Sequence, residues 1–520
     1  MKKKNTFFVI QNGTKCSEDS RKHKVSVTEI LRYALDDKLK WFKLLSLIFL
    51  SFACTPQPKN VTDTTEPAPI YPDYTDITIP YNIAPLNFLL RNEAEAIHVT
   101  LQGETESWSI QSDNHQVCFP LKKWHEFMKA NQGKTLKVNL IALKEGKWLR
   151  YPSFLWTISK DKIDSYLSYR LIEPAYEVWN EVEIRERNIE NFEERVLSTH
   201  ENTNNACMNC HIYGNHSGDL SMFHLRGANG GTILNRDGQL RKLTLKNQDM
   251  ISATVYGDFH PSGRFGIFST NIIIPSFHAF ENERFEVYDT ASDLVITDFD
   301  ENRLISSPLI ADKSKFETFP TFSPDGKYVY FCTADTVSLP ENIEQLKYSL
   351  CRITFDAANK QWGEQVDTLW NAKTMNGSVC HPKVSPDGKF LLYTVADYGT
   401  FPIWHRETEL QMMNLQTGAI DSLKNVNSNR SETYHSWSSN SRWFVFASKR
   451  GDGQYGKPYF CYIDETGQAH KPFVLPQQYP DHYDMTLKSF NIPDLSASPT
   501  PFDAKDIGRI FEKIPAEVFQ

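Results

Sequence analysis

The chain has 520 residues, of which 40% are hydrophobic and 13% aromatic, enough to bury the cores of about two to four domains. Its net charge of −8 and pI near 6.0 argue against a nucleic-acid partner, which would favour a basic surface. A mean hydropathy of −0.47 excludes a polytopic membrane protein.

Residues 1–54 predict a signal and lipoprotein leader. A short apolar run over 44–53 follows a lysine-rich stretch and ends at Cys54. It is too short to span a bilayer as a helix and is typical of a signal peptide. A cysteine at this point resembles a bacterial lipobox, so we expect lipidation of Cys54 and attachment to a membrane surface. A plain cleaved signal or an uncleaved anchor is the alternative.

Residues 55–76 are rich in Pro, Thr and acidic residues, which predicts a disordered tether. Residues 77–160 predict a small β-sandwich-like domain with one helix. Apolar and polar residues alternate over 98–103 and 107–112, as in half-buried strands, and residues 137–158 read as a hairpin. The spacing over 121–133 is helical and ends at a glycine.

Residues 161–218 predict a short helical segment, broken near Pro174, that carries a haem-attachment motif. The motif is Cys207-Met208-Asn209-Cys210-His211. Two thiols at this spacing can each add to a porphyrin vinyl group, and the histidine then becomes the proximal iron ligand. Half a zinc site would need a second Cys/His pair, and a redox CxxC would need a βαβ context; neither is present. We therefore expect one covalently bound haem c.

The sixth iron ligand is less well defined by the sequence. His224 is the first choice and Met222 the second, while a residue such as His260, or an open position, is the remaining alternative. A methionine would raise the iron potential relative to a histidine. The guanidinium of Arg226 suits a haem propionate, and a surface salt bridge is an equal alternative.

Four similar stretches predict a β-propeller over residues 219–475. Their turn residues are His260, Ser323, Ser385 and Ser438. Each stretch has an apolar residue, a four-residue turn and a strand of aromatic and β-branched residues, the pattern of propeller blades. Residues 222–243 predict a fifth blade, and a sixth is available from the chain ends, with 476–520 as a C-terminal extension.

The SPDG turn followed by an aliphatic and aromatic strand resembles the TolB-type β-propeller repeat. The whole layout resembles TolB-like propeller lipoproteins with one c-type haem motif ahead of the propeller. The matching stretches are IPYNIAPLNF, YRLIEPAYEVWN, CMNCH, FHLRGANGGT, the two SPDG turns, FPIWHRETELQMMNL and SETYHSWSSNSRWFVFASKRGDG. The turns HPSG and SSNS depart from the repeat. The resemblance implies a mainly β fold with a five- or six-bladed propeller, in a lipoprotein of the outer membrane on its periplasmic side. It implies no substrate.

Two further patterns have a structural and a functional interpretation. Residues 451–456 satisfy GxGxxG, but a strand follows where a dinucleotide site needs a helix, which favours a hairpin loop. A polar cluster predicts either a binding face or hydrogen bonds between blades, and we favour the latter. Its members are Trp404, His405, Arg406, Glu407, Glu409, Tyr434 and His435. Five cysteines remain unassigned, and most are expected to be buried thiols: Cys118, Cys332, Cys351, Cys380 and Cys461.

These features favour electron transfer or redox-linked binding of a redox partner or another envelope protein at the propeller face. A protein- or glycan-binding scaffold with a structural haem is the first alternative. A haem enzyme with an open iron position is the second. No GxSxG elbow is present, which weighs against a peptidase.

Overall fold

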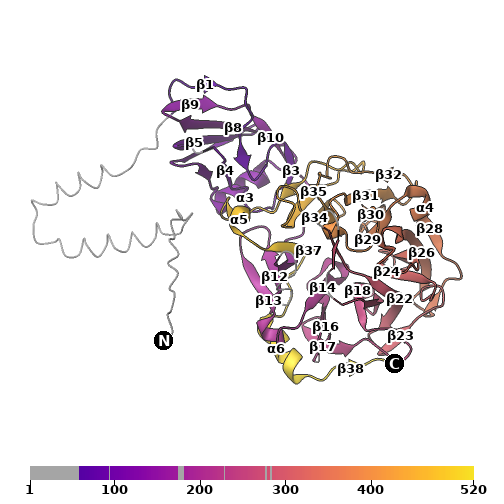
Figure 1. The fold of residues 1–520 in the computed structure, drawn as a ribbon. Coiled ribbons are helices and arrows are strands. Elements are labelled where there is room, and N and C mark those ends of the chain that lie inside the picture. The colour runs from indigo at the N-terminus through magenta and orange to yellow at the C-terminus, as the bar shows by residue number, and fades with distance from the viewer. Residues whose placement is uncertain (1–57, 93, 174–180, 228, 276–277, 281–283) are drawn as a thin grey trace, which may run out of the picture.

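The computed structural model describes residues 58–92, 94–173, 181–227, 229–275, 278–280 and 284–520. The predicted leader and Cys54 lie outside these residues. The described chain forms a small N-terminal domain and a larger ring of β-sheets, and the two are in contact (Figure 1). In the described residues, no helix is both long and apolar enough to cross a membrane.

The N-terminal domain has two sheets and one helix around an aromatic core. The larger sheet contains β1 (Thr62–Asp63), β3 (Ile77–Pro80), β5 (Ala96–Gln102), β6 (Ser107–Ser112), β8 (Thr135–Lys144), β9 (Lys147–Arg150) and β10 (Phe154–Ser159). The smaller sheet contains β2 (Ile70–Tyr71), β4 (Phe88–Leu90) and β7 (Gln116–Val117). The predicted helix is α3 (Leu121–Ala130), whose fully buried Trp124 packs 5.8 Å from the ring of Trp156. The predicted hairpin is β8–β9.

The prediction of a disordered tether over 55–76 is wrong for its described part. Strand β1 pairs in parallel with β9, and β2 pairs with β4. The ring of Tyr74 is fully buried, and the indole of Trp156 donates to the carbonyl of Tyr74 over 2.6 Å. Short edge strands tolerate proline, so a proline-rich composition does not exclude them.

Six units of four main antiparallel strands follow, and one parallel bridge between the third and fourth units, from Ser292 to Phe316, links these two into a single nine-stranded sheet. The first contains β11 (Tyr166–Ile172), β12 (Glu183–Asn188), β13 (Glu194–Thr199) and β37 (Ser489–Ser496). The second contains β14 (Met208–Tyr213), β15 (Leu220–Leu225), β16 (Gly231–Arg236) and β17 (Gln239–Thr244), with β38 (Glu517–Val518) at its edge. The third contains β18 (Thr254–Phe259), β19 (Phe265–Ile273), β22 (Asp289–Asp298) and β23 (Arg303–Ile305).

The fourth unit contains β24 (Lys315–Phe322), β25 (Tyr328–Asp335), β26 (Ser349–Asp356) and β28 (Asp367–Trp370), with β27 (Gln361–Trp362) at its edge. The fifth contains β29 (Ser378–Val384), β30 (Phe390–Ala396), β31 (Glu409–Asn414) and β32 (Ile420–Asp421). The sixth contains β33 (Glu432–Trp437), β34 (Trp443–Ser448), β35 (Lys457–Tyr462) and β36 (Phe473–Val474). Short elements lie between them: β20 (His278–Phe280), β21 (Arg284–Glu286), α4 (Ala372–Met375) and α5 (His482–Met485).

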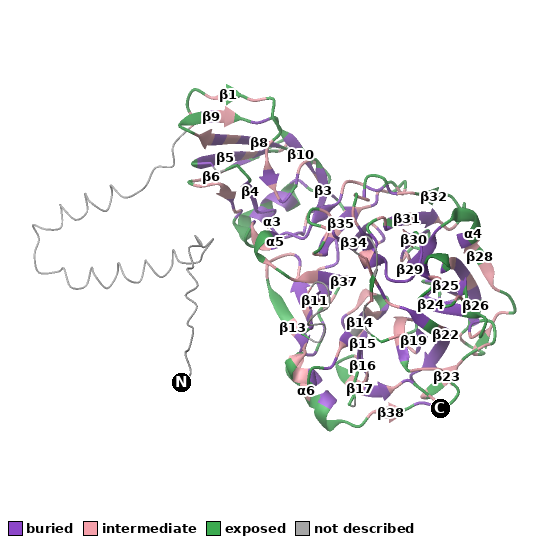
Figure 2. Ribbon diagram, viewed as in Figure 1, coloured by how far each residue is buried: buried purple, intermediate pink, exposed green. Residues whose placement is uncertain are grey.

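The innermost strands of these units touch one another in a cycle. Strand β14 contacts β18, β18 contacts β24, and the series continues through β29 and β33 to β37, which contacts β14 again. Buried residues follow the strands, and exposed residues lie mainly on the connecting loops (Figure 2). The arrangement is therefore of the mainly β propeller type.

The predicted repeats are the inner hairpins of units three to six, and their turns have the expected chemistry. In the β24–β25 turn, the Ser323 hydroxyl donates to Asp325 over 2.6 Å and accepts from the backbone N–H of Tyr328 over 2.9 Å. Gly326 then adopts φ +72°, which glycine tolerates without strain. Ser385 makes the corresponding bonds in the β29–β30 turn.

The prediction of helices over 161–218 is wrong, because β11, β12 and β13 occupy the described part of this segment. Residues 174–180, including the proposed break at Pro174, lie outside the described residues. Strand β11 lies between β12 and β37, and most of its side chains are buried. A strand buried on both faces loses the alternation of apolar and polar residues, and its apolar run then resembles that of a helix.

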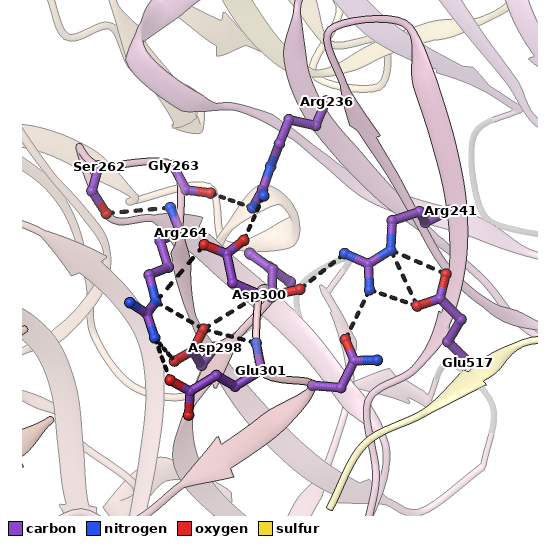
Figure 3. A network of polar contacts seen from close by, with 11 residues as sticks. Arg236, Arg241, Ser262, Gly263, Arg264, Asp298, Asp300, Glu301 and Glu517 are labelled. Atoms are coloured by element: carbon purple, nitrogen blue, oxygen red, sulfur yellow. Dashed lines mark hydrogen bonds and ion pairs between the residues drawn. The ribbon is translucent and has the colours of Figure 1, made fainter.

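The C-terminal residues pair with and pack against strands of the first two units. Strand β37 is the inner strand of the first unit, and helix α6 (Ala504–Lys513) packs its apolar side on β13 and β17. The guanidinium of Arg241 contacts the carboxylate of Glu517 at 2.5 Å, which fixes β38 beside β17 (Figure 3). In the adjoining network, Arg264 pairs with the buried carboxylate of Asp298 at 2.7 Å (Figure 3).

The N-terminal domain and the sixth unit share one apolar core that includes Trp156 and Trp443. The indole of Trp443 donates to the carbonyl of Asp161 over 3.1 Å, and the hydroxyl of Ser439 donates to Asp164 over 2.6 Å. The two parts are therefore joined by packing as well as by the chain.

Candidate functional site on the entry face

The candidate site lies on one face of the ring, which we call the entry face because the innermost strands begin there. Ile172 at the end of β11 pairs with Ser489 at the start of β37, and Glu432 at the start of β33 pairs with Ser448. The guanidinium of Arg170 donates to the carbonyl of Met208 over 3.5 Å, which brings the start of β14 to the same face. The CxxCH motif is therefore on the entry face.

The motif is in an extended strand rather than at a helix end. Residues 208–213 form β14, and a β-bulge lies between Asn209 and Ile212. Bulges occur at corresponding places in β18, β24, β29 and β33. His211 thus occupies the repeated bulge position of an inner strand. Bulges redirect side chains, and they are common next to functional sites.

At the other bulges, aromatic rings of successive inner strands contact one another in a tilted arrangement. The ring centroids of Tyr256 and Phe319 lie 4.7 Å apart, those of Phe319 and His381 lie 4.3 Å apart, and those of His381 and Tyr434 lie 4.7 Å apart. Phe319, His381 and Tyr434 have positive φ, a backbone strain that persists only where the surroundings hold it. His211 is the ring-bearing residue at the corresponding bulge of β14.

His211 is buried, with 4% of its surface exposed, and neither ring nitrogen makes a hydrogen bond of good geometry with the described residues. The ring lies beside the backbone of Ser168 and Ile492. Burial, aided by the charge of Arg170, lowers the pKa of His211 to about 4, so the imidazole is neutral at pH 7. An unpartnered buried polar group costs about 1–3 kcal/mol, which coordination to a metal would offset.

Two of the three residues predicted to hold a haem, Cys207 and His211, have described side chains. Cys207 is a free, partly exposed thiol at the start of β14, and His211 has an unpartnered nitrogen four positions later. The iron-facing nitrogen would have to be uncovered, because it is buried here. In the described part of the chain, no group of three or more His, Cys, Asp or Glu side chains is placed to hold a metal ion.

Both residues predicted as candidates for the sixth iron ligand have other contacts in the structure. His224 Nε2 donates to the carbonyl of Val255 over 2.8 Å, and Nδ1 accepts from the Thr232 hydroxyl over 2.7 Å. Both nitrogens are therefore occupied at the contact between the second and third units. Met222 is 1% exposed and packs in the apolar core.

Arg226 and His260, the other two predicted residues, lie at different places. The backbone N–H of Arg226 donates to the carbonyl of Cys207 over 3.0 Å, and its side chain is exposed on the entry face. No ion pair of Arg226 is present among the described residues, so its role toward a haem propionate stays a prediction. His260 lies in the turn after β18 and bonds Ser262 at 2.8 Å.

The polar cluster around His405 connects two loops of the entry face by polar contacts. Hydrogen bonds between blades were the favoured prediction for this cluster. His405 Nε2 lies 2.8 Å from Glu286, and both side chains are fully buried. His405 Nδ1 lies 3.4 Å from Glu407, which also pairs with Arg284 at 2.9 Å. His435 Nε2 donates to the Leu392 carbonyl over 3.0 Å, a bond between the fifth and sixth units.

We expect the contribution of His405 to stability to fall as pH rises. Burial alone lowers the pKa of His405, but the bonds and charges of Glu286 and Glu407 outweigh it and raise the pKa above 6.5. A raised pKa in the folded protein gives stability that is fully present below pH 6.5 and is lost as pH rises through the folded pKa. His405→Gln should cost about 2 kcal/mol at low pH and less at high pH, measured by urea unfolding at about pH 6 and 9.

His115→Gln is the matched control, because His115 forms no ion pair with the described acidic residues. Comparing the two variants separates the loss of the ion pairs of His405 from the loss of a histidine as such. An equal cost of His405→Gln at both pH values would contradict a stabilising charge on His405.

Sequence reasoning missed a shallow pocket beside β37 on the same face. Its walls include Ile172, Trp404, Lys449 and Asn491. Lys449 follows β34 directly and is 4% exposed, yet its Nζ has no hydrogen-bond partner in the described part of the chain. A single lysine after an apolar strand carries no signal of burial in the sequence.

The remaining motifs have structural roles. The GxGxxG stretch is a loop that leads into β35, as expected for a hairpin. The buried free thiols are Cys332, Cys351, Cys380 and Cys461, and Cys118 is disulfide-bonded. Burial raises the pKa of each of the four free thiols, which makes them poor nucleophiles.

The strand arrangement defines a propeller-type protein with a CxxCH motif at its entry face. No family model matches the sequence, and no curated protein matches it significantly. The chain is similar in structure to TolB from Acinetobacter baumannii, with a TM-score of 0.42 and 13% identity over 70% of this chain and 80% of that one.

Two other solved structures are similar to a lesser degree. For a puromycin-hydrolyzing peptidase of Mycobacterium tuberculosis, the TM-score is 0.34 at 10% identity, over 80% of this chain and 57% of that one. For a periplasmic gluconolactonase of Pseudomonas aeruginosa, it is 0.25 at 16% identity, over 50% of this chain and 80% of that one.

Proposed function

We propose that the six units are the blades of one closed six-bladed propeller. The observation that supports this is the cyclic contact of the inner strands, with β37 from the C-terminus completing the blade begun by β11. Pairing an early strand of the propeller with a late one in the same blade would hold the ring together.

We propose further that the protein is a monohaem c-type redox protein. Cys207 and Cys210 would form the thioether links, and His211 would be the proximal ligand. The observation that carries the proposal is a CxxCH motif on an exposed face whose histidine is neutral and unpartnered at both nitrogens. A bound haem supplies reversible one-electron chemistry.

The rest of the chain would then hold this group and bind a partner. Arg226, exposed beside Cys207, suits a haem propionate, and the entry face suits a redox partner or another envelope protein. With lipidation at Cys54, the protein would be anchored to the outer membrane on its periplasmic side. Electron transfer or redox-linked binding is the proposed role; a scaffold with a structural haem and an enzyme with an open iron are the alternatives.

The test is a pyridine haemochrome spectrum and a redox titration of protein expressed with a c-type maturation system. The haem proposal expects a spectrum of a haem with both vinyl groups saturated, and electron transfer expects a reversible one-electron wave. High-spin iron that binds CO would favour the enzyme instead. Absence of covalent haem would contradict both and leave the scaffold.

A further inference from the structure

The amine of Lys449 is a buried cationic group without a counter-charge. Its Nζ lies 3.1 Å from the centroid of the Trp404 ring, and no described carboxylate comes within ion-pair distance. Asp452, the nearest acidic influence, bonds Lys457 at 2.9 Å instead. The neighbouring Arg450 forms an ion pair with Glu432 at 3.2 Å. Buried charges in proteins are normally paired, whereas the protonated amine of Lys449 has the Trp404 ring as its contact and no counter-anion among the described residues.

The pocket around Lys449 has the parts of a small-anion site. Ile172 and the Trp404 ring give apolar walls, while Ser489 and Asn491 add polar groups at the start of β37. Glu173 also lines the pocket, and its negative charge disfavours anions that carry two charges. The chemistry therefore favours a singly charged, planar anion attached to a short apolar group.

We propose that this pocket binds a carboxylate group, with Lys449 as its counter-charge. Two sources share this chemistry: a free small carboxylate, and a propionate of the haem. The second source rests on the proposed function. Strand β37 supports it, because Asn491 lines the pocket and the next residue, Ile492, lies beside His211.

Protonation of Lys449 gives this binding a distinctive signature. Burial lowers the pKa of Lys449 to about 7, and Asp452 only partly opposes the shift. At about pH 8 the amine is then largely neutral, and an incoming carboxylate must draw a proton from solution. At about pH 5.5 the amine is already protonated, and binding takes up no proton.

The test is calorimetric titration of the full-length protein with propionate, in buffers of different ionisation enthalpy. We expect saturable binding, uptake of about one proton per propionate near pH 8, and none near pH 5.5. Propionamide, which carries no charge, should not bind. Lys449→Met should weaken binding more than about tenfold, whereas Lys449→Arg should keep binding but lose the proton uptake. Lys373→Met, at a lysine that is 84% exposed, should change nothing.

Haem-loaded protein and the haem-free Cys207→Ala, Cys210→Ala variant distinguish the two sources. Binding to both forms identifies a free carboxylate, and binding to the haem-free form alone identifies a haem propionate. No saturable binding to either form, or proton-coupled binding that survives Lys449→Met, would overturn the proposal. Neither result depends on the redox properties of the haem. Failure of carboxylate binding is therefore distinguishable from failure of the haem proposal.

Discussion

Truncation after Lys488 is expected to abolish cooperative folding of the propeller. The deletion removes β37, which pairs with β11 along its length and contacts both β14 and β33. It also removes Phe490 and Leu495 from the core that the N-terminal domain shares with the sixth unit. The first unit would lose its inner strand, and with it the contacts of that strand with β14 and β33. Circular dichroism with urea titration should give a broad transition of low amplitude.

A matched pair of leucines tests the same strand without a deletion. Leu495 is fully buried in β37, whereas Leu487, just outside it, is 64% exposed. Leu495→Ala should cost about 3 kcal/mol and Leu487→Ala less than about 0.5 kcal/mol. A truncated chain that unfolds as cooperatively as the full chain, or equal costs for the two leucines, would show that β37 does not hold the ring.

The double variant Cys207→Ala, Cys210→Ala is expected to lose all covalent haem while the propeller stays folded. A thioether link needs a thiol, and alanine has none. Cys207 is partly exposed and directly precedes β14, so its replacement should leave the core intact. The measurement is haem staining of denatured protein after expression with a c-type maturation system, beside an unfolding curve.

Cys351→Ala with Cys461→Ala is the control, because both thiols are free and buried in strands away from the motif. This control should stain as the wild type does. His224→Ala should leave the spectrum unchanged, since both nitrogens of His224 are already hydrogen-bonded. Staining that survives in the Cys207, Cys210 variant would refute attachment at the motif. A change of spin state in His224→Ala would identify His224 as an iron ligand.

Local patterns predicted the elements whose contacts are themselves local. The turns at Ser323 and Ser385 lie within hairpins, and their serine, aspartate and glycine act within a few residues. The helix α3 and the hairpin β8–β9 follow from spacing and turn residues in the same way. These elements were predictable because each side chain that decides them is close in sequence to the backbone it stabilises.

Elements that depend on distant partners were not predictable. Strand β11 was taken for a helix because its second neighbour, β37, comes from the other end of the chain. The hydrogen bonds of His224 to Thr232 and to the carbonyl of Val255 are likewise not visible in a motif. The burial of Lys449 depends on loops of several units that meet only in the folded ring.

The sequence by itself determined the repeated hairpins, the mainly β character and the CxxCH motif with its proposed haem ligand His211. Only the tertiary structure decided that β37 joins β11, that His211 lies at a bulge near the axis, and that Lys449 is buried without a partner. The physical reason is that turn and strand preferences act over a few residues, whereas β pairing, burial and charge compensation are set by residues that the fold brings together.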